Sequence, residues 1–173
     1  LSNTTINGSL TSTGNINLTG GSVSGLVTSS SNTITTNGTN LGGGATAQSG
    51  MTITGGTISG NFNMTAYNAA TFSGVTMTSG NISGASIVTI QSGSVLGSTS
   101  SVISISSNSG AITVNNSTVY GNLTAPSYST VNVSNGASVI GTCTPGSTPA
   151  NACGGAPPAV CPAGVSSGIT GYY

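Results

Sequence analysis

Short stretches along most of this chain alternate an apolar residue with a small polar one. Ile, Val, Leu or Met occupies every second position, and Asn, Ser or Thr stands between them. Because successive side chains of a strand point to opposite faces, this period of two predicts strands of about four residues with one buried face. Gly, Asn and Ser punctuate the stretches and predict turns. The clearest stretches are 16–19, 33–35, 51–54, 75–78, 103–105 and 131–133.

A degenerate eight-residue repeat links these stretches: apolar, polar, turn pair, small, apolar, small, Gly. Copies occupy 18–25, 53–60 and 77–84, and looser copies occupy 90–97, 114–121 and 133–141, so the spacing between copies runs from 13 to 35 residues. The pattern predicts strand, tight turn and strand, with Gly supplying the positive φ angles that such turns need. One unit cannot bury its apolar edge alone, whereas stacked units form a continuous narrow core.

These observations predict an all-β fold, a single right-handed parallel β-solenoid with irregular coils over residues 1–141. Helix is disfavoured because Gly, Ser, Thr and Asn dominate, and β-branched residues favour strands. The alternative is a β-sandwich of antiparallel hairpins, which also predicts frequent turns. The small aliphatic apolar residues and the absence of Trp favour the solenoid.

The repeat resembles the β-solenoid segments of bacterial surface proteins: autotransporter passengers, haemagglutinin-type adhesins and bactofilin-like polymer-forming repeats. The resemblance covers residues 5–141 and is closest over 114–141, which includes Val-Tyr-Gly-Asn-Leu-Thr-Ala-Pro at 119–126. It implies a solenoid whose ends are uncapped and stack end to end. The chain departs from bactofilin-like proteins in lacking charge and in carrying a cysteine-bearing tail, so the resemblance does not imply a cytoskeletal role.

The composition changes after residue 141. Residues 142–162 hold five of the six prolines and all three cysteines, Cys143, Cys153 and Cys161. Because Pro interrupts a strand ladder, we predict an irregular Cys/Pro-rich segment over 142–173. The three cysteines form one disulfide and one free thiol, or the third cysteine bonds a neighbouring subunit; the spacing does not decide the pairing. Oxidised cysteines would place the chain outside the cell or on its surface.

The chain contains no Lys, Arg, Asp, Glu or His among its 173 residues, although about 25% of an average soluble domain is charged. Acid–base catalysis and most metal sites depend on these side chains, so we expect no catalytic residue, no cofactor and no metal ligand. Nucleic-acid binding relies on cations that neutralise phosphates and is excluded too. The apolar runs are shorter than the roughly 20 residues of a membrane-spanning helix.

Neutrality also removes the usual barrier to self-association. Neither end of the chain offers a charged gatekeeper or an amphipathic capping helix, and both ends read as strand. We therefore expect copies of the chain to stack end to end, with the chain itself as partner. The assembly-interface candidates are Leu1, Ile6, Ile169, Tyr172 and Tyr173.

The function predicted from these features is structural: a subunit of a secreted, self-assembling filament or pilus-like surface fibre serving adhesion or biofilm cohesion, with surface or biofilm components as further partners. One alternative is a monomeric adhesin or passenger stalk. Another is an ice-binding solenoid, suggested by Thr-x-Thr steps that could align on one face. These steps lie at 11/13, 33/35, 52/54 and 76/78.

Overall fold

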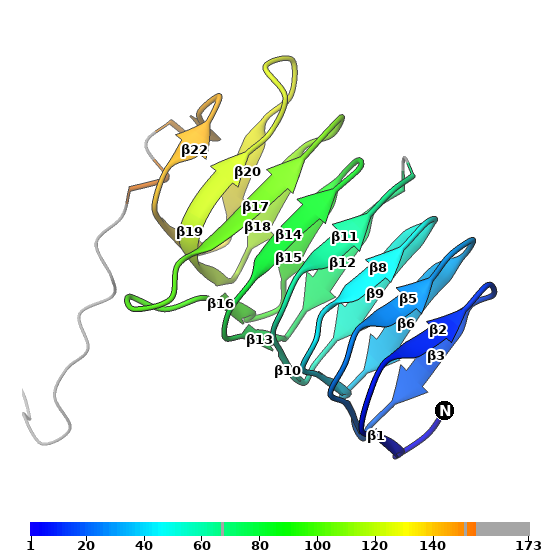
Figure 1. Cartoon of the computed structure of the whole chain (residues 1–173). Coiled ribbons are helices and arrows are strands. Elements are labelled where there is room, and N and C mark those ends of the chain that lie inside the picture. The colour runs from blue at the N-terminus through cyan, green and yellow to red at the C-terminus, as the bar shows by residue number, and fades with distance from the viewer. Residues whose placement is uncertain (67, 151, 155–173) are drawn as a thin grey trace, which may run out of the picture.

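The chain folds into a parallel β-solenoid of about eight turns, seen in a computed structural model that describes residues 1–66, 68–150 and 152–154 (Figure 1). Every pairing between its named strands is parallel, and the described residues contain no helix. The predicted all-β solenoid is thus confirmed. The antiparallel sandwich is wrong, because each strand pairs with its counterpart one turn away and not with its neighbour in sequence.

Each turn contributes one strand to each of three sheets, which form the three faces of the rod. Sheet A contains β3 (Ile16–Thr19), β6 (Thr33–Asn37), β9 (Gly50–Thr54), β12 (Ala70–Ser73), β15 (Val88–Gln91), β18 (Ile112–Asn115), β20 (Val131–Ser134) and β23 (Ser147–Thr148). Sheet B contains β1 (Thr5–Ile6), β4 (Ser22–Val23), β7 (Asn40–Leu41), β10 (Thr57–Ile58), β13 (Thr76–Met77), β16 (Val95–Leu96), the first part of β19 (Thr118–Thr124) and β21 (Ser138–Ile140). Sheet C contains β2 (Leu10–Ser12), β5 (Val27–Ser29), β8 (Ala45–Ala47), β11 (Phe62–Met64), β14 (Asn81–Gly84), β17 (Ile103–Ser107), the second part of β19 and β22 (Cys143–Thr144).

The repeat seen in the sequence occurs once per turn, at the corner between sheets A and B. Its first apolar position forms a column in sheet A in which each residue pairs with the next: Leu18, Thr36, Ile53, Phe72, Ile90, Val114 and Val133. The turns in this column are 17 to 24 residues long, since Thr36 pairs with Ile53 and Ile90 with Val114. The predicted spacing of 13 to 35 residues is wrong. The copy at 36–43 was missed because Thr36 stands where most other copies have an apolar residue. The copy assigned to 77–84 does not align with the others, because Met77 belongs to sheet B and not to the column in sheet A.

The turn pair of the repeat adopts the left-handed conformation that its composition predicts. Gly38 and Gly55 have φ of 67° and 61°, values that glycine adopts without steric cost. Asn116 and Asn135, with φ of 46° and 52°, occupy this corner in the later turns. Asn is among the few other residues that tolerate this conformation, which explains why it can replace the first glycine of the turn pair in these copies.

The core is a narrow channel filled by stacked inward columns. In sheet B the column runs Val23, Leu41, Ile58, Met77, Leu96, Val119 and Val139, all buried. In sheet C it runs Val27, Ala45, Phe62, Ile82, Ile105 and Leu123, also buried. Full burial of such a side chain stabilises the fold by about 1.5–3 kcal/mol before entropy costs. Because the columns are continuous, each turn depends on the turn above and the turn below.

The strand ladder extends past the predicted boundary at residue 141. Cys143 of β22 pairs with Leu123, and Ser147 of β23 pairs with Val131, so this stretch forms the last turn and is not irregular. Pro145 and Pro149 directly follow these two short strands and stand outside them. A proline placed there removes no hydrogen bond from the ladder, which is why the prolines do not end it. The rest of the predicted irregular segment, 155–173, lies outside the described residues.

Candidate functional site: the two ends of the solenoid

At the N-terminal end, two strands pair on one side only, as far as the described residues show. β1 is the terminal strand of sheet B and β2 the terminal strand of sheet C. Ile6 of β1 stacks on Val23, Leu10 of β2 stacks on Val27, and both are half-buried against the core. In a parallel ladder alternate N–H and C=O groups face the next strand, so half of those in β1 and β2 face away from the body of the solenoid.

Sheet A continues slightly further at this end. Ser2 forms a parallel bridge with Thr19, and the Leu1 amino group donates a hydrogen bond to the carbonyl oxygen of Asn17 at 2.8 Å. The Thr19 N–H donates to the Leu1 carbonyl oxygen at 2.9 Å. Leu1 and Ser2 therefore add a short outer rung to sheet A, and the Leu1 side chain remains 62% exposed.

A hollow of about 340 Å³ lies at this end of the core, lined by Leu1, Asn15 and residues of β2 and β3. The lining residues Leu10, Ile16 and Leu18 are the first members of inward columns that continue through the next turns. The N-terminal end thus presents the cross-section of the core together with open strand edges. Of the predicted interface residues, Leu1 and Ile6 both lie here.

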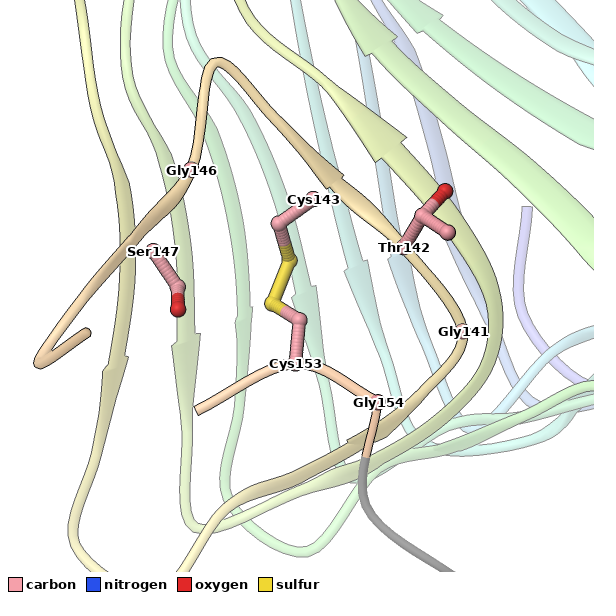
Figure 2. Close-up of a pocket in the computed structure, with 7 residues that line it drawn as sticks. All are labelled: Gly141, Thr142, Cys143, Gly146, Ser147, Cys153 and Gly154. Carbon is pink, nitrogen blue, oxygen red and sulfur yellow. A yellow bond between two sulfur atoms is a disulfide. The ribbon is translucent and has the colours of Figure 1, made fainter. Parts of the chain in front are cut away.

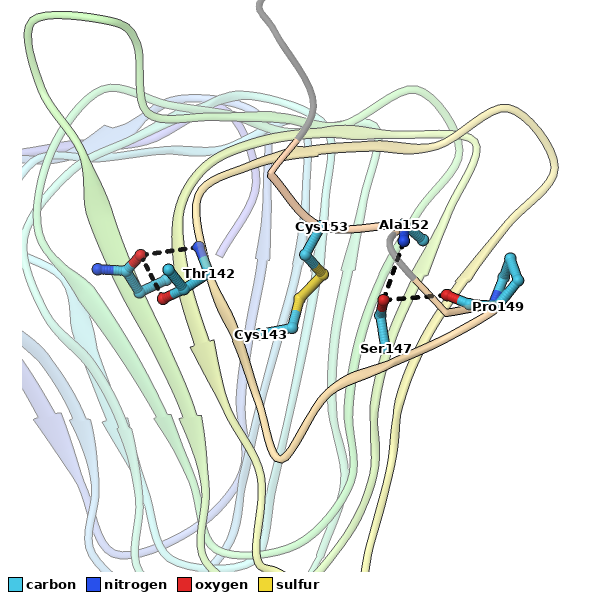
Figure 3. The surroundings of a disulfide bond; sticks show 7 residues. Thr142, Cys143, Ser147, Pro149, Ala152 and Cys153 are labelled. Atoms are coloured by element: carbon cyan, nitrogen blue, oxygen red, sulfur yellow. Dashed lines mark hydrogen bonds between the residues drawn. A yellow bond between two sulfur atoms is a disulfide. The ribbon is translucent and has the colours of Figure 1, made fainter.

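The C-terminal end is organised by a disulfide. Cys143 and Cys153 are bonded, with their Cα atoms 5.8 Å apart (Figures 2 and 3). Cys153 forms a parallel bridge with Val139, and the Gly154 N–H donates to the Val139 carbonyl oxygen at 3.1 Å. Cys153 and Gly154 therefore begin a ninth rung of sheet B, and both cysteines pack on the core.

The segment before Cys153 is tied back to the last turn by side-chain contacts. The Ala152 N–H donates to Ser147 Oγ at 3.0 Å, and the Ser147 hydroxyl donates to the Pro149 carbonyl oxygen at 3.0 Å (Figure 3). A pocket of about 300 Å³ lies beside the disulfide, between Gly141 and Gly154 (Figure 2). Its lining carries no ionisable side chain, because the sulfur atoms of its two cysteines are bonded to each other.

The structure therefore shows part of the disulfide pairing that the sequence left open: the first two cysteines, Cys143 and Cys153, are bonded to each other. The third, Cys161, lies outside the described residues, as do the interface candidates Ile169, Tyr172 and Tyr173. Sequence reasoning missed Leu10 and Val139, which form the core at the two ends. Their signal was present, because each occupies the inward position of the strand pattern, but nothing in the sequence showed which turns come first and last in the stack.

The Thr-x-Thr steps do not share a face. Thr11 lies in sheet C, the steps at 33/35 and 52/54 lie in sheet A, and Thr76 lies in sheet B. Sheet A instead carries a different ladder on its outer surface, in which each threonine pairs with the next: Thr35, Thr52, Thr71, Thr89 and Thr113. The sequence signal for its last three members is a single Thr between two buried residues, as in Ala70-Thr71-Phe72.

No protein-family model, no curated protein and no solved structure matches this chain. The fold defines its class, a parallel β-solenoid. Over the described residues, no helix has the length and apolar character needed to cross a membrane, and no three potential metal-binding side chains of the His, Cys, Asp and Glu type gather.

Proposed function

We propose that this chain is a structural subunit of a self-assembling extracellular filament or surface fibre. The observation that supports the proposal is the structure of the N-terminal end. There, open edges of β1 and β2 surround a core cross-section whose half-buried members, Ile6 and Leu10, belong to continuous inward columns. A second copy placed against this end would extend the ladders by strand addition and bury the exposed part of both side chains.

The disulfide supports the extracellular location, because such bonds persist in oxidising compartments. The hydroxyl and amide side chains on the outer faces carry no charge, so charged side chains do not drive the subunits apart. In this arrangement the contact between ends is the functional site, and the rod itself carries no chemistry.

The filaments should be indifferent to pH and salt. Because the chain has no Asp, Glu, His, Lys or Arg, neither stability nor association is linked to the titration of such groups, and there are no ion pairs for salt to screen. Electron microscopy without reductant should show the same filaments from about pH 4.5 to about pH 7, a range that contains none of the ordinary pKa values of the chain termini, thiols or phenols. The same result is expected from low to molar salt. Dispersed monomers throughout would overturn the filament and favour the monomeric stalk.

A second candidate function, ice binding, is favoured by the five-rung threonine ladder on sheet A. Strands repeat about every 4.8 Å, so the ladder presents hydroxyl and methyl groups as a flat, regular and uncharged array. A solution of the protein should then show thermal hysteresis, which Thr71→Lys should abolish by placing a long charged side chain in the centre of the array. Thr11→Lys adds the same charge on sheet C and should retain the hysteresis. Absence of hysteresis in the unmodified protein would exclude this function.

A further inference from the structure

The Cys143–Cys153 disulfide determines how far each sheet extends at the C-terminal end. Among the described residues, the last rung of sheet A is β23 and the last rung of sheet C is β22, whereas sheet B has one more rung, formed by Cys153 and Gly154 on the outer edge of β21. Cys153 pairs with Val139 and so extends the inward column of sheet B. Cys143 pairs with Leu123 and so extends the inward column of sheet C. The disulfide therefore joins the last described member of one column to that of the other. Figure 2 shows the bond itself.

At the N-terminal end the three sheets also extend to different heights, in a way that complements the C-terminal end. Its outermost rung, Leu1 and Ser2, belongs to sheet A, and the next rung along the chain is β1 in sheet B. If a second copy is placed above the C-terminal end with its columns in line, its Leu1 and Ser2 fall on β23. Its β1 then falls on Cys153 and Gly154. Ile6 of the second copy would continue the column of Val119, Val139 and Cys153. Counting the described residues, sheet C would lack one rung and sheets A and B would lack none.

Without the Cys153 rung, the two ends would not match in sheet B. An incoming copy seated on β23 would leave β1 one strand spacing, about 4.8 Å, too far from β21 to form hydrogen bonds. The ladder would then be interrupted in two of the three sheets.

The rung itself depends on the disulfide. Its polar contact with the last turn consists of one bridge and the hydrogen bond from Gly154, and the Ala152 N–H adds bonds to Ser147 and Pro149. Ala152 and Cys153 also pack on the core but stay partly exposed. Ordering several backbone residues costs more free energy than so few hydrogen bonds recover. The covalent bond removes much of that cost by closing the loop of sequence separation 10.

We propose that the Cys143–Cys153 disulfide is a redox-sensitive assembly clip, which holds the docking rung for the first turn of a second copy of this chain. This inference rests on the proposed filament. A dithiol reductant opens the clip by thiol–disulfide exchange: the disulfide takes up two electrons and two protons and becomes two thiols, while the reductant becomes a disulfide. Released from Cys143, the segment leaves sheet B, and end-to-end addition stops although the other turns stay folded.

The test compares two variants of the full 173-residue chain. Cys161→Ser keeps the clip and removes the third thiol, whereas Cys143→Ser/Cys153→Ser/Cys161→Ser removes all three. Polymer is measured by sedimentation and electron microscopy with and without dithiothreitol, and hydrogen exchange is followed along the chain. We expect oxidised Cys161→Ser to polymerise and dithiothreitol to raise its critical concentration at least tenfold. The triple variant should behave like the reduced protein under both conditions, with faster exchange confined to 138–154.

Three results would overturn the inference in distinguishable ways. If the triple variant polymerises as readily as oxidised Cys161→Ser, the clip is not needed for docking and the filament proposal survives. If oxidised Cys161→Ser remains monomeric at every concentration, the filament proposal fails and the docking role of the clip fails with it. Unchanged exchange in 138–154 of the triple variant would show that the rung does not depend on the disulfide.

Discussion

Replacing Ile6 by Lys is expected to abolish end-to-end assembly and leave the solenoid folded. Ile6 is half-buried in the terminal strand of sheet B, so in the single molecule a lysine can extend its ammonium group past the end of the core into water. In the proposed assembly the same position is enclosed between Val23 of its own copy and Cys153 of the next. An unpaired charge buried there costs several kcal/mol, and about 3 kcal/mol corresponds to a rise in the critical concentration of roughly a hundredfold.

The matched control for this experiment is Thr5→Lys. Thr5 is the neighbour of Ile6 in the same strand, but its side chain is exposed on the outer surface of sheet B. This variant adds the same charge one residue away without placing it in the core, so it should polymerise nearly as the unmodified chain does. Sedimentation across a concentration series measures both variants, and circular dichroism checks that both remain folded. Equal polymerisation of the two variants would show that the inward face of β1 is not part of the contact.

The solenoid could be predicted from the sequence because its two main determinants are local. The alternation in stretches such as 51–54 specifies which side chains face inward, and the turn pair at Gly55 and Gly56 specifies a sharp corner. Together they describe the part of the turn that varies least, from the end of a sheet A strand to the following sheet B strand. Burial then requires stacking, because an isolated turn leaves its columns exposed.

The remainder of the turn could not be predicted because its length varies. The connection from sheet C to sheet A takes five residues between β11 and β12 but two between β8 and β9. Such loops lie outside the ladder and tolerate insertions, so no fixed period locates sheet C in the sequence. The expected alignment of all four Thr-x-Thr steps on one face was wrong for this reason, and only the steps at 33/35 and 52/54 share a sheet. One copy of the repeat was not recognised because it has the polar residue Thr36 at a position that is usually apolar in a core column. The buried Thr36 hydroxyl has no hydrogen-bond partner among the described residues.

The disulfide and the docking rung show a different limit of sequence reasoning. The spacing of the cysteines leaves several pairings open, whereas the bond between Cys143 and Cys153 follows from which strands end the stack. Cys143 reaches the end of the core by stacking on Leu123, and Cys153 does so by stacking on Val139. These placements depend on the count of residues in every preceding turn, which only the three-dimensional register supplies.

Replacing Phe72 by Ala is expected to cause the largest loss of stability. Phe72 is fully buried in the sheet A column between Ile53 and Ile90, and its ring meets that of Phe62 edge-on, with centroids 5.6 Å apart. The truncation removes buried apolar surface and an aromatic pair and leaves a cavity that the rigid ladders on three sides cannot close. The free energy of unfolding should fall by about 3–5 kcal/mol, a large part of the 5–15 kcal/mol typical of a folded domain.

Because the turns of a solenoid are stacked in a single row, the loss of stability caused by Phe72→Ala should be concentrated near the cavity. Each turn contacts only its neighbours, so the cavity should weaken β9, β12 and β15 and divide the rod into two separately unfolding parts. Urea denaturation should become less cooperative, and hydrogen exchange should rise in these strands more than in β20 at the distal end. Thr71→Ala, on the outer surface of the same strand, should change stability by no more than about 0.5 kcal/mol. A uniform rise in exchange along the whole rod would show that the turns unfold as one unit and are not coupled only to their neighbours.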